Sequence, residues 1–437
     1  MSPAVGARVP LGFEPLSTSH WVRAAPAVEP AARLETELEC DAVVIGAGYT
    51  GLVSALMLAE AGRSVCLLEA EQPGWAASGR NAGQVIPMMW GAHKTPANII
   101  ATYGENLGCR MNTMVAAAGR NLFTLIERHA IDCDAQRGYV CVVRSEKSVA
   151  RWQARFEAWR DYGGRFEALD RASLARYVVS PRYCGAFLLP DGGRVNPLSL
   201  SRGLAAALRR AGGQLFGSSR ALGVDRVGGA WRVATSLGAV HCQTVLVGAG
   251  GYADSLFPVL RKVGIPMLCG VLATDPLPNG GAEILPGGMP MADMDDPAVF
   301  GPSIDAQGCL IVSYMIGARE PSVSRALRIV GPRLERAFPH FNPPPFRRHW
   351  VGRFLINFDG VPSLMRLDEN IFAVAVCNGV GHTLGISAAV QLARLALGAA
   401  DADVDLAVHD PRATAGSAFL PALLRRVVMP LANRLGA

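Results

Sequence analysis

The sequence predicts an α/β protein built from two interleaved domains, and three observations support this. Residues 41–69 read as a buried strand, a glycine-rich turn, a helix and a second strand. Two further apolar strands are expected at 244–247 and 371–376, and the segment 264–350 between them is rich in proline, glycine and short β-like runs. A chain of 437 residues, 50% of them apolar, is long enough to bury two cores.

Composition excludes several classes of function. The net charge of +6 arises from 42 basic and 36 acidic residues scattered along the chain, and no basic run carries the aromatics of a nucleic-acid groove, so no nucleic-acid partner is expected. The 10 cysteines show neither a CxxC pair nor zinc spacing, so we expect reduced core thiols and no metal site. The first residues lack the basic and apolar regions of a secretory signal, and a cytoplasmic location is expected.

A GxGxxG motif stands between the first strand and the first helix. The strand Asp41–Ile45 runs into Gly46, Gly48 and Gly51, and strong helix formers follow from Leu52 to Ala61. The first glycine permits a tight turn, the second lets the backbone approach a pyrophosphate, and the third lets helix and strand pack closely. The motif therefore predicts a dinucleotide site with its phosphates at a helix N-terminus.

An acidic residue ends the second strand of this unit. Glu69 follows the strand Ser64–Leu68 and stands 23 residues after Gly46 (69 − 46 = 23). A carboxylate at this place accepts hydrogen bonds from both hydroxyls of an adenosine ribose, and it repels a 2′-phosphate. NADP is therefore disfavoured. FAD and NAD share this βαβ unit, so the unit alone leaves both cofactors open.

The loop after the second strand carries a family resemblance. Residues 74–84 read GWAASGRNAGQ. Together with the βαβ unit, this loop resembles the D-amino-acid oxidase/glycine oxidase superfamily, and more narrowly its γ-glutamylputrescine oxidase-like branch, over residues 20–398. The resemblance implies noncovalent FAD in a discontinuous Rossmann-like domain of the glutathione-reductase type, with an inserted antiparallel-sheet α+β substrate domain. The implied flavin contacts from this loop are Ser78, Gly79, Arg80, Asn81, Gly83, Gln84 and Val85.

Two later segments fit the same resemblance. Val245–Gly250 resembles the family strand whose glycine end passes near the FAD phosphates. Asn378–Gly385 resembles a block in which a helix N-terminus points at the flavin and stabilises negative charge on it. Thr383 and Asn357 depart from the family pattern, where glycine and threonine are usual. The further cofactor contacts implied are Tyr49, Thr50, Ala70, Ala221, Gly248, Ala249, Gly250, Gly379, Gly381, His382 and Thr383.

The resemblance also implies a reaction. The C–N bond of an amine or amino acid, of the γ-glutamyl-amine or amino-acid type, is oxidised to an imine, and oxygen or a quinone then reoxidises the flavin. His382 is expected beside the flavin and is the candidate catalytic base, although hydride transfer from a neutral amine needs no side-chain base. Arg319 and Arg353 are candidates for holding a substrate carboxylate. Other candidates for the substrate side are Trp90, His93 and Tyr314.

The expected domain bounds follow from these motifs. The FAD domain is expected in 40–90, 185–262 and 350–400, and the substrate domain in 91–184 and 263–349, after an irregular lead-in at 1–39. The tail 401–437 mixes apolar residues with arginines and could lie on a membrane surface. Packing against the protein is favoured, because Pro430 limits a long amphipathic helix. An NAD-dependent dehydrogenase and a non-catalytic flavin-binding scaffold stay open as alternatives, and the oligomeric state is not predicted.

Overall fold

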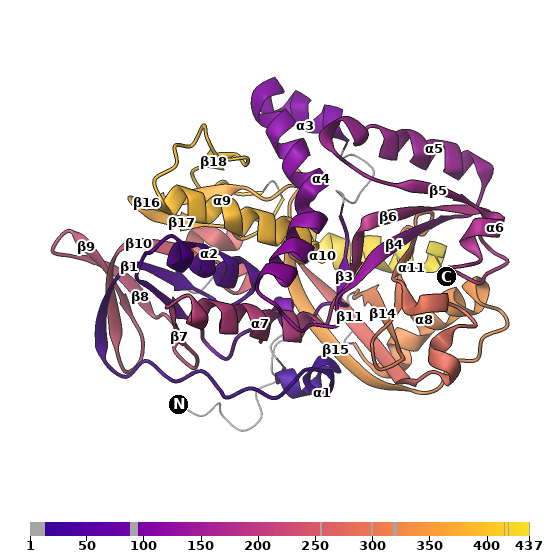
Figure 1. The fold of residues 1–437 in the computed structure, drawn as a ribbon, viewed down its shortest axis with the longest axis horizontal. Coiled ribbons are helices and arrows are strands. Elements are labelled where there is room, and N and C mark those ends of the chain that lie inside the picture. Colours follow the sequence, from indigo (N-terminus) through magenta and orange to yellow (C-terminus); the bar gives the residue numbers. More distant parts are fainter. Residues whose placement is uncertain are drawn as a thin grey trace.

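The chain forms three sheets with helices packed around them. The fold is taken from a computed structural model, which describes residues 14–87, 95–253, 256–298, 300–317, 321–414, 416–417 and 419–436. The sheets have nine, five and four strands. In Figure 1 the nine-stranded sheet lies on the left with α2 (Tyr49–Glu60), α7 (Pro197–Arg210) and α9 (Ile386–Ala396), and the two smaller sheets lie on the right.

The large sheet is built around parallel strands. Its order is β18 (Val408–His409), β16 (Leu364–Asp368), β17 (Ile371–Ala373), β10 (Ala239–Val247), β1 (Glu37–Ile45), β2 (Val65–Leu68) and β7 (Gln214–Phe216). A hairpin of β8 (Gly223–Val227) and β9 (Ala230–Ala234) pairs with β10. The strands β1, β2, β7, β10 and β17 run parallel, so their carboxyl ends meet at one edge, where open α/β sheets bind ligands.

The two smaller sheets form the other half of the molecule. The five-stranded sheet contains β12 (Met291–Asp293), β4 (Gln136–Val143), β6 (Gly185–Arg194), β3 (Gln84–Val85) and β5 (Glu167–Asp170). The four-stranded sheet has the order β13 (Pro302–Ile304), β14 (Cys309–Met315), β11 (Ile265–Pro276) and β15 (Phe346–Ile356), and all its pairs are antiparallel. The antiparallel β-rich segment that the sequence predicts at 264–350 corresponds to most of this four-stranded sheet.

The expected domain bounds and the sheets do not coincide everywhere. Strand β6 falls within the expected FAD segment 185–262, yet it pairs with β3, β4 and β5 in the five-stranded sheet. Most of β15 likewise falls within 350–400 but pairs with β11. Both strands pair within the smaller sheets over their whole length, so the chain returns to the half with the large sheet only after each of them ends. An apolar run carries no signal of the sheet in which it will pair. The domain bounds stay a prediction.

Helices cover the upper and lower sides of the smaller sheets in Figure 1. The sequence predicts a helical stretch from Pro96 to Ala130 that three glycines interrupt. The structure breaks it only at Gly104, which has φ +81° and separates α3 (Pro96–Tyr103) from α4 (Glu105–Arg128). The other helices of this half are α5 (Glu146–Glu157), α6 (Arg171–Leu174) and α8 (Val323–Ala337).

The segment before β1 packs against the body of the protein through His20 and Trp21. Trp21, at the start of α1 (Trp21–Ala24), is buried and donates its indole N–H to the carbonyl of Asn81 at 2.8 Å. The Nε2 atom of His20 lies 2.5 Å from Oδ2 of Asp305. Cys309 lies beside this pair, but Asp305 already accepts the backbone N–H of Cys309, and we expect no metal there.

The last described segment differs from expectation in one respect. Pro430 does not end the helix: α10 (Leu420–Leu423), a π-helical stretch (Leu424–Val428) and α11 (Met429–Gly436) follow one another without a gap. The wider π-helical stretch ends two positions before Pro430, and such turns are one way in which a helix accommodates a residue that disrupts its hydrogen bonds.

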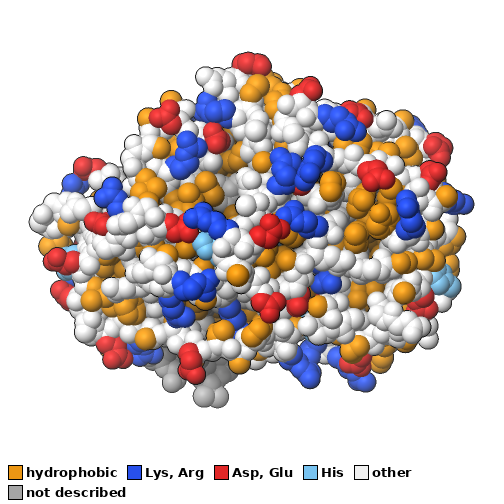
Figure 2. Space-filling model, in the orientation of Figure 1, with side chains coloured by type: hydrophobic (Ala, Val, Ile, Leu, Met, Phe, Trp, Pro, Cys, Tyr) orange, Lys and Arg blue, Asp and Glu red, His pale blue; other side chains and the backbone are white. Residues whose placement is uncertain are grey.

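The distribution of surface charge and the character of the helices can be compared with what the composition indicates. On the face shown in Figure 2, basic and acidic side chains are interspersed. Within the described ranges, no helix combines the length and the apolarity needed to cross a membrane.

Candidate cofactor and substrate site

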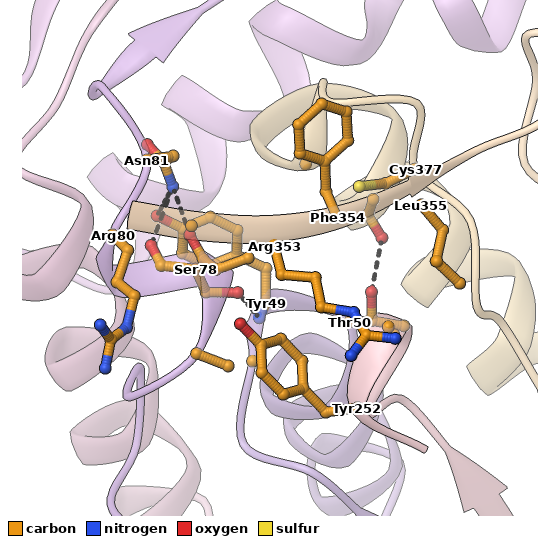
Figure 3. A pocket seen from close by; sticks show the side chains of 18 of the residues that line it. Tyr49, Thr50, Ser78, Arg80, Asn81, Tyr252, Arg353, Phe354, Leu355 and Cys377 are labelled. Atoms are coloured by element: carbon orange, nitrogen blue, oxygen red, sulfur yellow. Dashed lines mark hydrogen bonds between the residues drawn. The ribbon is translucent and has the colours of Figure 1, made fainter. Parts of the chain in front are cut away.

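A cavity of about 380 Å³ lies where the large sheet meets the four-stranded sheet. One end is lined by the loops that follow β1, β2 and β10, and the other end by residues of β11, β14 and β15. Figure 3 shows residues of both halves converging on this space, with Thr50 and Ser78 from one side and Phe354 and Leu355 from the other. The carboxyl edge of the parallel strands is therefore the site of the cavity, as the fold class predicts.

The glycine motif forms the floor of the first end. Gly46 has φ +98°, and a Cβ atom there would lie 2.9 Å from Cα of Ala249 after β10. A Cβ on Gly51 would lie 1.8 Å from the carbonyl oxygen of Gly46, so the third glycine lets α2 pack on the loop. Helix α2 begins at Tyr49, whose backbone N–H is donated to Oγ of Ser78 at 3.0 Å, and the partial positive charge of this helix N-terminus favours an anion in the cavity.

Glu69 stands at the end of β2 as the motif predicts. Its Oε2 accepts the backbone N–H of Ala47 at 2.6 Å, and its Oε1 accepts that of Glu71 at 3.0 Å. Burial raises the pKa of the Glu69 carboxyl, and these two N–H groups oppose the rise. A carboxylate can accept about four hydrogen bonds. Glu69 lines the cavity together with Ala70 and Ala221, so acceptor capacity remains for a ribose diol.

We expect Glu69→Ala to weaken FAD binding while the absorption spectrum of the bound flavin stays unchanged. Two hydrogen bonds to a charged acceptor are lost, which corresponds to on the order of 2–4 kcal/mol, and the ribose lies far from the flavin ring. Titration of the apoprotein with FAD measures the affinity. Glu369→Ala, at an exposed carboxylate on the turn before β17, is the control. A strongly altered flavin spectrum would contradict this placement of Glu69.

The loop at 75–84 is held by its own polar groups. Asn81 donates its amide to the carbonyl of Ser78 at 2.9 Å and accepts the N–H of Gly83 at 2.9 Å. The guanidinium of Arg80 is buried, lies over the ring of Trp75 at 4.7 Å, and donates from Nε to the Trp75 carbonyl at 2.7 Å. Backbone and side chains of this loop therefore present a rigid wall to the cavity.

His382 is buried at the cavity wall and is paired on both ring nitrogens. Its Nδ1 lies 3.0 Å from the carbonyl oxygen of Gln84, which can only accept, so Nδ1 carries the proton. Its Nε2 lies 2.9 Å from the hydroxyl of Tyr49 and accepts from it. Burial lowers the pKa of His382 to about 4, so the ring is neutral at physiological pH. This geometry favours a positioning role, and the role of catalytic base stays a prediction.

The two departures from the family pattern have local explanations. The hydroxyl of Thr383 donates to the carbonyl of Ile86 at 2.8 Å, within a π-helical stretch (Gly381–Gly385) that precedes α9. Asn357 donates to the carbonyl of Val361 at 3.0 Å and accepts the N–H of Gly360 at 2.8 Å. Asn357 therefore shapes a turn, and both side chains are satisfied by the protein itself.

Most of the predicted cofactor residues line the cavity. These are Gly46, Gly48, Tyr49, Thr50, Glu69, Ala70, Ser78, Arg80, Asn81, Gln84, Ala221, Gly248, Ala249, Gly250, Gly379, Gly381 and His382. Five do not: Gly51, Gly79, Gly83, Val85 and Thr383. The glycines among these five pack against other parts of the protein, and Val85 is fully buried in the core. These five residues stand in the same segments as the lining residues, behind the cavity wall.

The structure describes only some of the residues that the sequence predicts on the substrate side. Tyr314 and Arg353 line the cavity. Arg319, Trp90 and His93 lie outside the described residues. Sequence reasoning did not single out Trp75, although it stands in the loop at 74–84 and lines the cavity. It missed further lining residues because they stand on strands and loops without a motif: Arg220, Tyr252, Cys269, Ser313, Met315, Phe354 and Cys377. Of these, Tyr252 had a usable signal, since it follows directly on the glycines after β10.

Comparison with known proteins agrees with this geometry. The model of the DAO family, described as "FAD dependent oxidoreductase", matches residues 41–395. The chain belongs to this family. The glycine loop, the half-buried carboxylate at the end of β2 and the close-packed loop after it fit FAD, and the protein is an FAD-dependent oxidoreductase. The family match decides between FAD and NAD, which the βαβ unit alone left open.

Curated and solved relatives extend the match over most of the chain. The FAD-dependent oxidoreductase is 32% identical to the γ-glutamylputrescine oxidoreductase of Escherichia coli (strain K12), over 88% of this chain and 90% of that protein. It is similar in fold to glycine oxidase from Geobacillus kaustophilus, with a TM-score of 0.65 at 18% identity over 82% of this chain and 95% of that one. An L-amino acid deaminase from Proteus vulgaris gives a TM-score of 0.68 at 20% identity over 85% and 93%.

Proposed function

We propose that the protein oxidises the C–N bond of an amine or amino acid, of the γ-glutamyl-amine or amino-acid type, to an imine. Bound FAD supplies an acceptor for the hydride that leaves the carbon next to nitrogen. Water then hydrolyses the imine to a carbonyl compound and an amine or ammonia. Oxygen or a quinone takes up the two electrons that the substrate has lost. The similarity to the E. coli γ-glutamylputrescine oxidoreductase supports this substrate class.

The observation that carries the proposal is the chemistry of the cavity end at the four-stranded sheet. Among the residues that the structure describes, no carboxylate lines this end; apart from the residues of β15, its lining consists of Cys269, Val271, Ala298, Ser313, Tyr314 and Met315. An ammonium group that enters an apolar, uncompensated space loses hydration, so its pKa falls. The site therefore favours the neutral amine, whose lone pair assists departure of the hydride.

The one phenol at this end is kept protonated. Burial raises the pKa of Tyr314 well above its usual range, and its hydroxyl lies 2.9 Å from Nε2 of His349. Burial also lowers the pKa of His349, so this ring is neutral. Tyr314 and His349 thus act as a neutral hydrogen-bonded pair, which fits a reaction in which no side chain needs to remove a proton from an ammonium group.

Anaerobic reduction of the flavin tests the proposal. The purified holoenzyme is mixed without oxygen with γ-glutamyl amines, simple amines and amino acids, and we expect at least one of them to bleach the visible flavin bands. Readmission of air, or addition of a quinone, then measures which acceptor restores the bands. If dithionite bleaches the flavin while no amine or amino acid does, the protein is a flavin-binding scaffold and the proposal is wrong.

A further inference from the structure

The helix at 420–436 exposes a continuous apolar stripe. Large apolar side chains stand at every fourth position on it, and all are exposed: Phe419, Leu423, Val427, Leu431 and Leu435. Phe419 is 64% exposed, Leu431 54% and Leu435 68%. A surface helix of a globular protein ordinarily turns its apolar side chains to the core and its polar ones to water. This helix does the opposite along its outer face.

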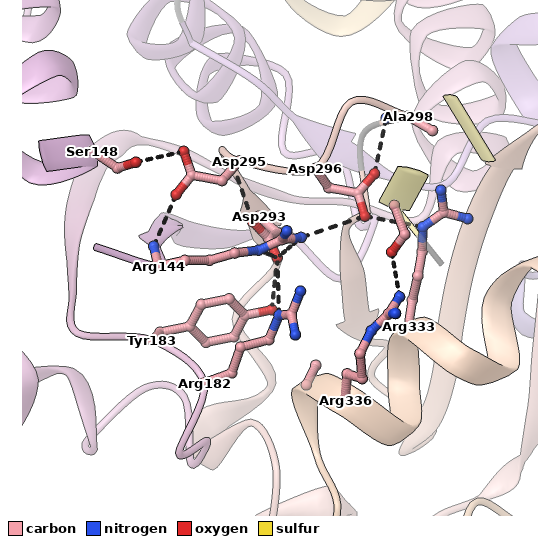
Figure 4. Close-up of polar contacts among 12 residues, drawn as sticks. Arg144, Ser148, Arg182, Tyr183, Asp293, Asp295, Asp296, Ala298, Arg333 and Arg336 are labelled. Carbon is pink, nitrogen blue, oxygen red and sulfur yellow. Dashed lines mark hydrogen bonds and ion pairs between the residues drawn. The ribbon is translucent and has the colours of Figure 1, made fainter. Parts of the chain in front are cut away.

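Polar contacts hold the inner face of the same helix. Arg333 of α8 donates from Nε to Asp296 at 3.0 Å and from NH2 to the carbonyl of Asn433 at 3.4 Å. Arg336, also of α8, donates to the carbonyl of Gly436 at 2.5 Å. Figure 4 shows Arg333 and Arg336 side by side, with Arg333 reaching Asp296. Guanidinium groups at the last carbonyls are a favourable way to end a helix.

A further contact ties the inner face to the wall of the cavity. The side-chain amide of Asn433 donates to the carbonyl of Met315 at 3.3 Å, and Met315 lines the cavity. The stripe therefore is not what attaches the helix to the protein. Its apolar side chains remain available to a partner outside.

The charges beside the stripe indicate which partner this is. The segment 411–437 contains four arginines and no aspartate, glutamate or lysine. Arg426 and Arg434 are exposed, and each stands one position before a member of the stripe, so both flank it. An amphipathic helix with apolar side chains on one face and arginines along its edge is suited to the interface of an anionic lipid bilayer.

A second copy of the chain fits the surface less well. In a contact with two-fold symmetry, the same surface of both copies forms the interface. Two segments that carry arginines and no acidic residues would then face each other. Like charges at such a contact oppose association. A bilayer with negative headgroups instead attracts the arginines while its acyl chains accept the apolar side chains.

We propose that the protein docks peripherally on anionic membranes through the 420–436 helix. The stripe enters the boundary between headgroups and acyl chains, and Arg426 and Arg434 contact lipid phosphates. Three arginines within this helix make it too polar to cross the bilayer, so the helix lies in the plane of the interface. The helix is roughly 25 Å long, which gives the stripe about four turns of contact.

Vesicle flotation of the FAD-loaded protein tests this proposal. We expect binding to phosphatidylcholine vesicles that contain about 30% phosphatidylglycerol and much weaker binding to pure phosphatidylcholine. Leu423→Ser/Leu431→Ser and, separately, Arg426→Gln/Arg434→Gln should each lower the partition coefficient by on the order of tenfold or more. Salt of about 0.5 M should weaken binding of the native protein by screening the arginines.

Matched control variants distinguish membrane binding by this helix from nonspecific binding by other exposed residues. Leu222→Ser/Leu237→Ser removes two leucines that are 60% and 52% exposed elsewhere, and Arg63→Gln/Arg209→Gln removes the same charge from other exposed positions. These variants should float like the native protein, and all variants should retain FAD. Equal flotation of the stripe variant and the native protein overturns the proposal. A second outcome also overturns the proposal: light scattering finds a dimer, Leu431→Ser dissociates it, and neither form binds vesicles. The stripe is then an interface between two copies of the chain.

Discussion

Gly48→Val is expected to leave the protein without FAD. A Cβ atom at this position would lie 3.0 Å from Oγ of Ser78, which already accepts the backbone N–H of Tyr49 at 3.0 Å. The two methyl groups of valine would extend into the space that the pyrophosphate needs beside the first turn of α2. We expect FAD binding to weaken by about 100-fold or more, which corresponds to ~3 kcal/mol of steric conflict.

The readout is the ratio of flavin absorbance to protein absorbance after purification and after titration with FAD. Gly331→Val is the matched control, because a Cβ at this helical position of α8 meets no atom within 4 Å. The control should purify yellow and the Gly48 variant colourless, with circular dichroism showing that both are folded. Full flavin occupancy in Gly48→Val would falsify the assignment of the glycine loop.

Arg353→Met is expected to weaken FAD binding as well. Arg353 and Leu355 stand two positions apart on β15 and face the same side, towards the glycines that follow β10. A Cβ on Gly251 would lie 3.8 Å from Nε of Arg353, and Tyr252 hydrogen-bonds to the Arg353 backbone. In Figure 3 the side chain of Arg353 extends towards Thr50, which stands in the first turn of α2. This orientation places the guanidinium on the cofactor side of the cavity.

The expected loss is on the order of 10–100-fold in FAD affinity, since a hydrogen bond to a charged group contributes about 1.5–3 kcal/mol. Arg347→Met is the control, because Arg347 lies on the same strand but is exposed and paired with Asp275. If Arg319 holds the substrate carboxylate, Arg319→Met should keep FAD and raise KM for carboxylated substrates. The expected increase in KM corresponds to about 2–4 kcal/mol of lost binding free energy. Unchanged FAD affinity of Arg353→Met, together with a raised KM, would show that Arg353 serves the substrate.

Much of the site follows from contiguous sequence. The turn of Gly46, Gly48 and Gly51 and the acid at Glu69 depend on spacings within about thirty residues of one βαβ unit, and local geometry enforces them wherever the unit forms. The loop at 74–84 adds a pattern specific enough to indicate the family. These elements were predictable because their conformation is determined by residues close to them in the chain.

Other parts required the tertiary structure. His382 and Tyr49 are 333 positions apart, and nothing in the sequence indicates that the Tyr49 hydroxyl hydrogen-bonds to a ring nitrogen of His382. The orientation of Arg353 depends on which side of β15 faces the glycines after β10, and the alternation along a strand does not reveal which face meets which neighbour. The outward direction of the apolar stripe at 419–435 is set by Arg333 and Arg336, which hold the opposite face of its helix from another part of the chain.

Sequence alone thus determined the cofactor unit, because a dinucleotide loop is specified by backbone geometry over short spacings. It also determined the class of the fold, because the order of apolar strands and helices restricts how a parallel sheet can be assembled. Only the tertiary structure decided what the cavity offers a substrate. Its far end is assembled from strands β11, β14 and β15, whose apolar residues come together only when the sheet has formed.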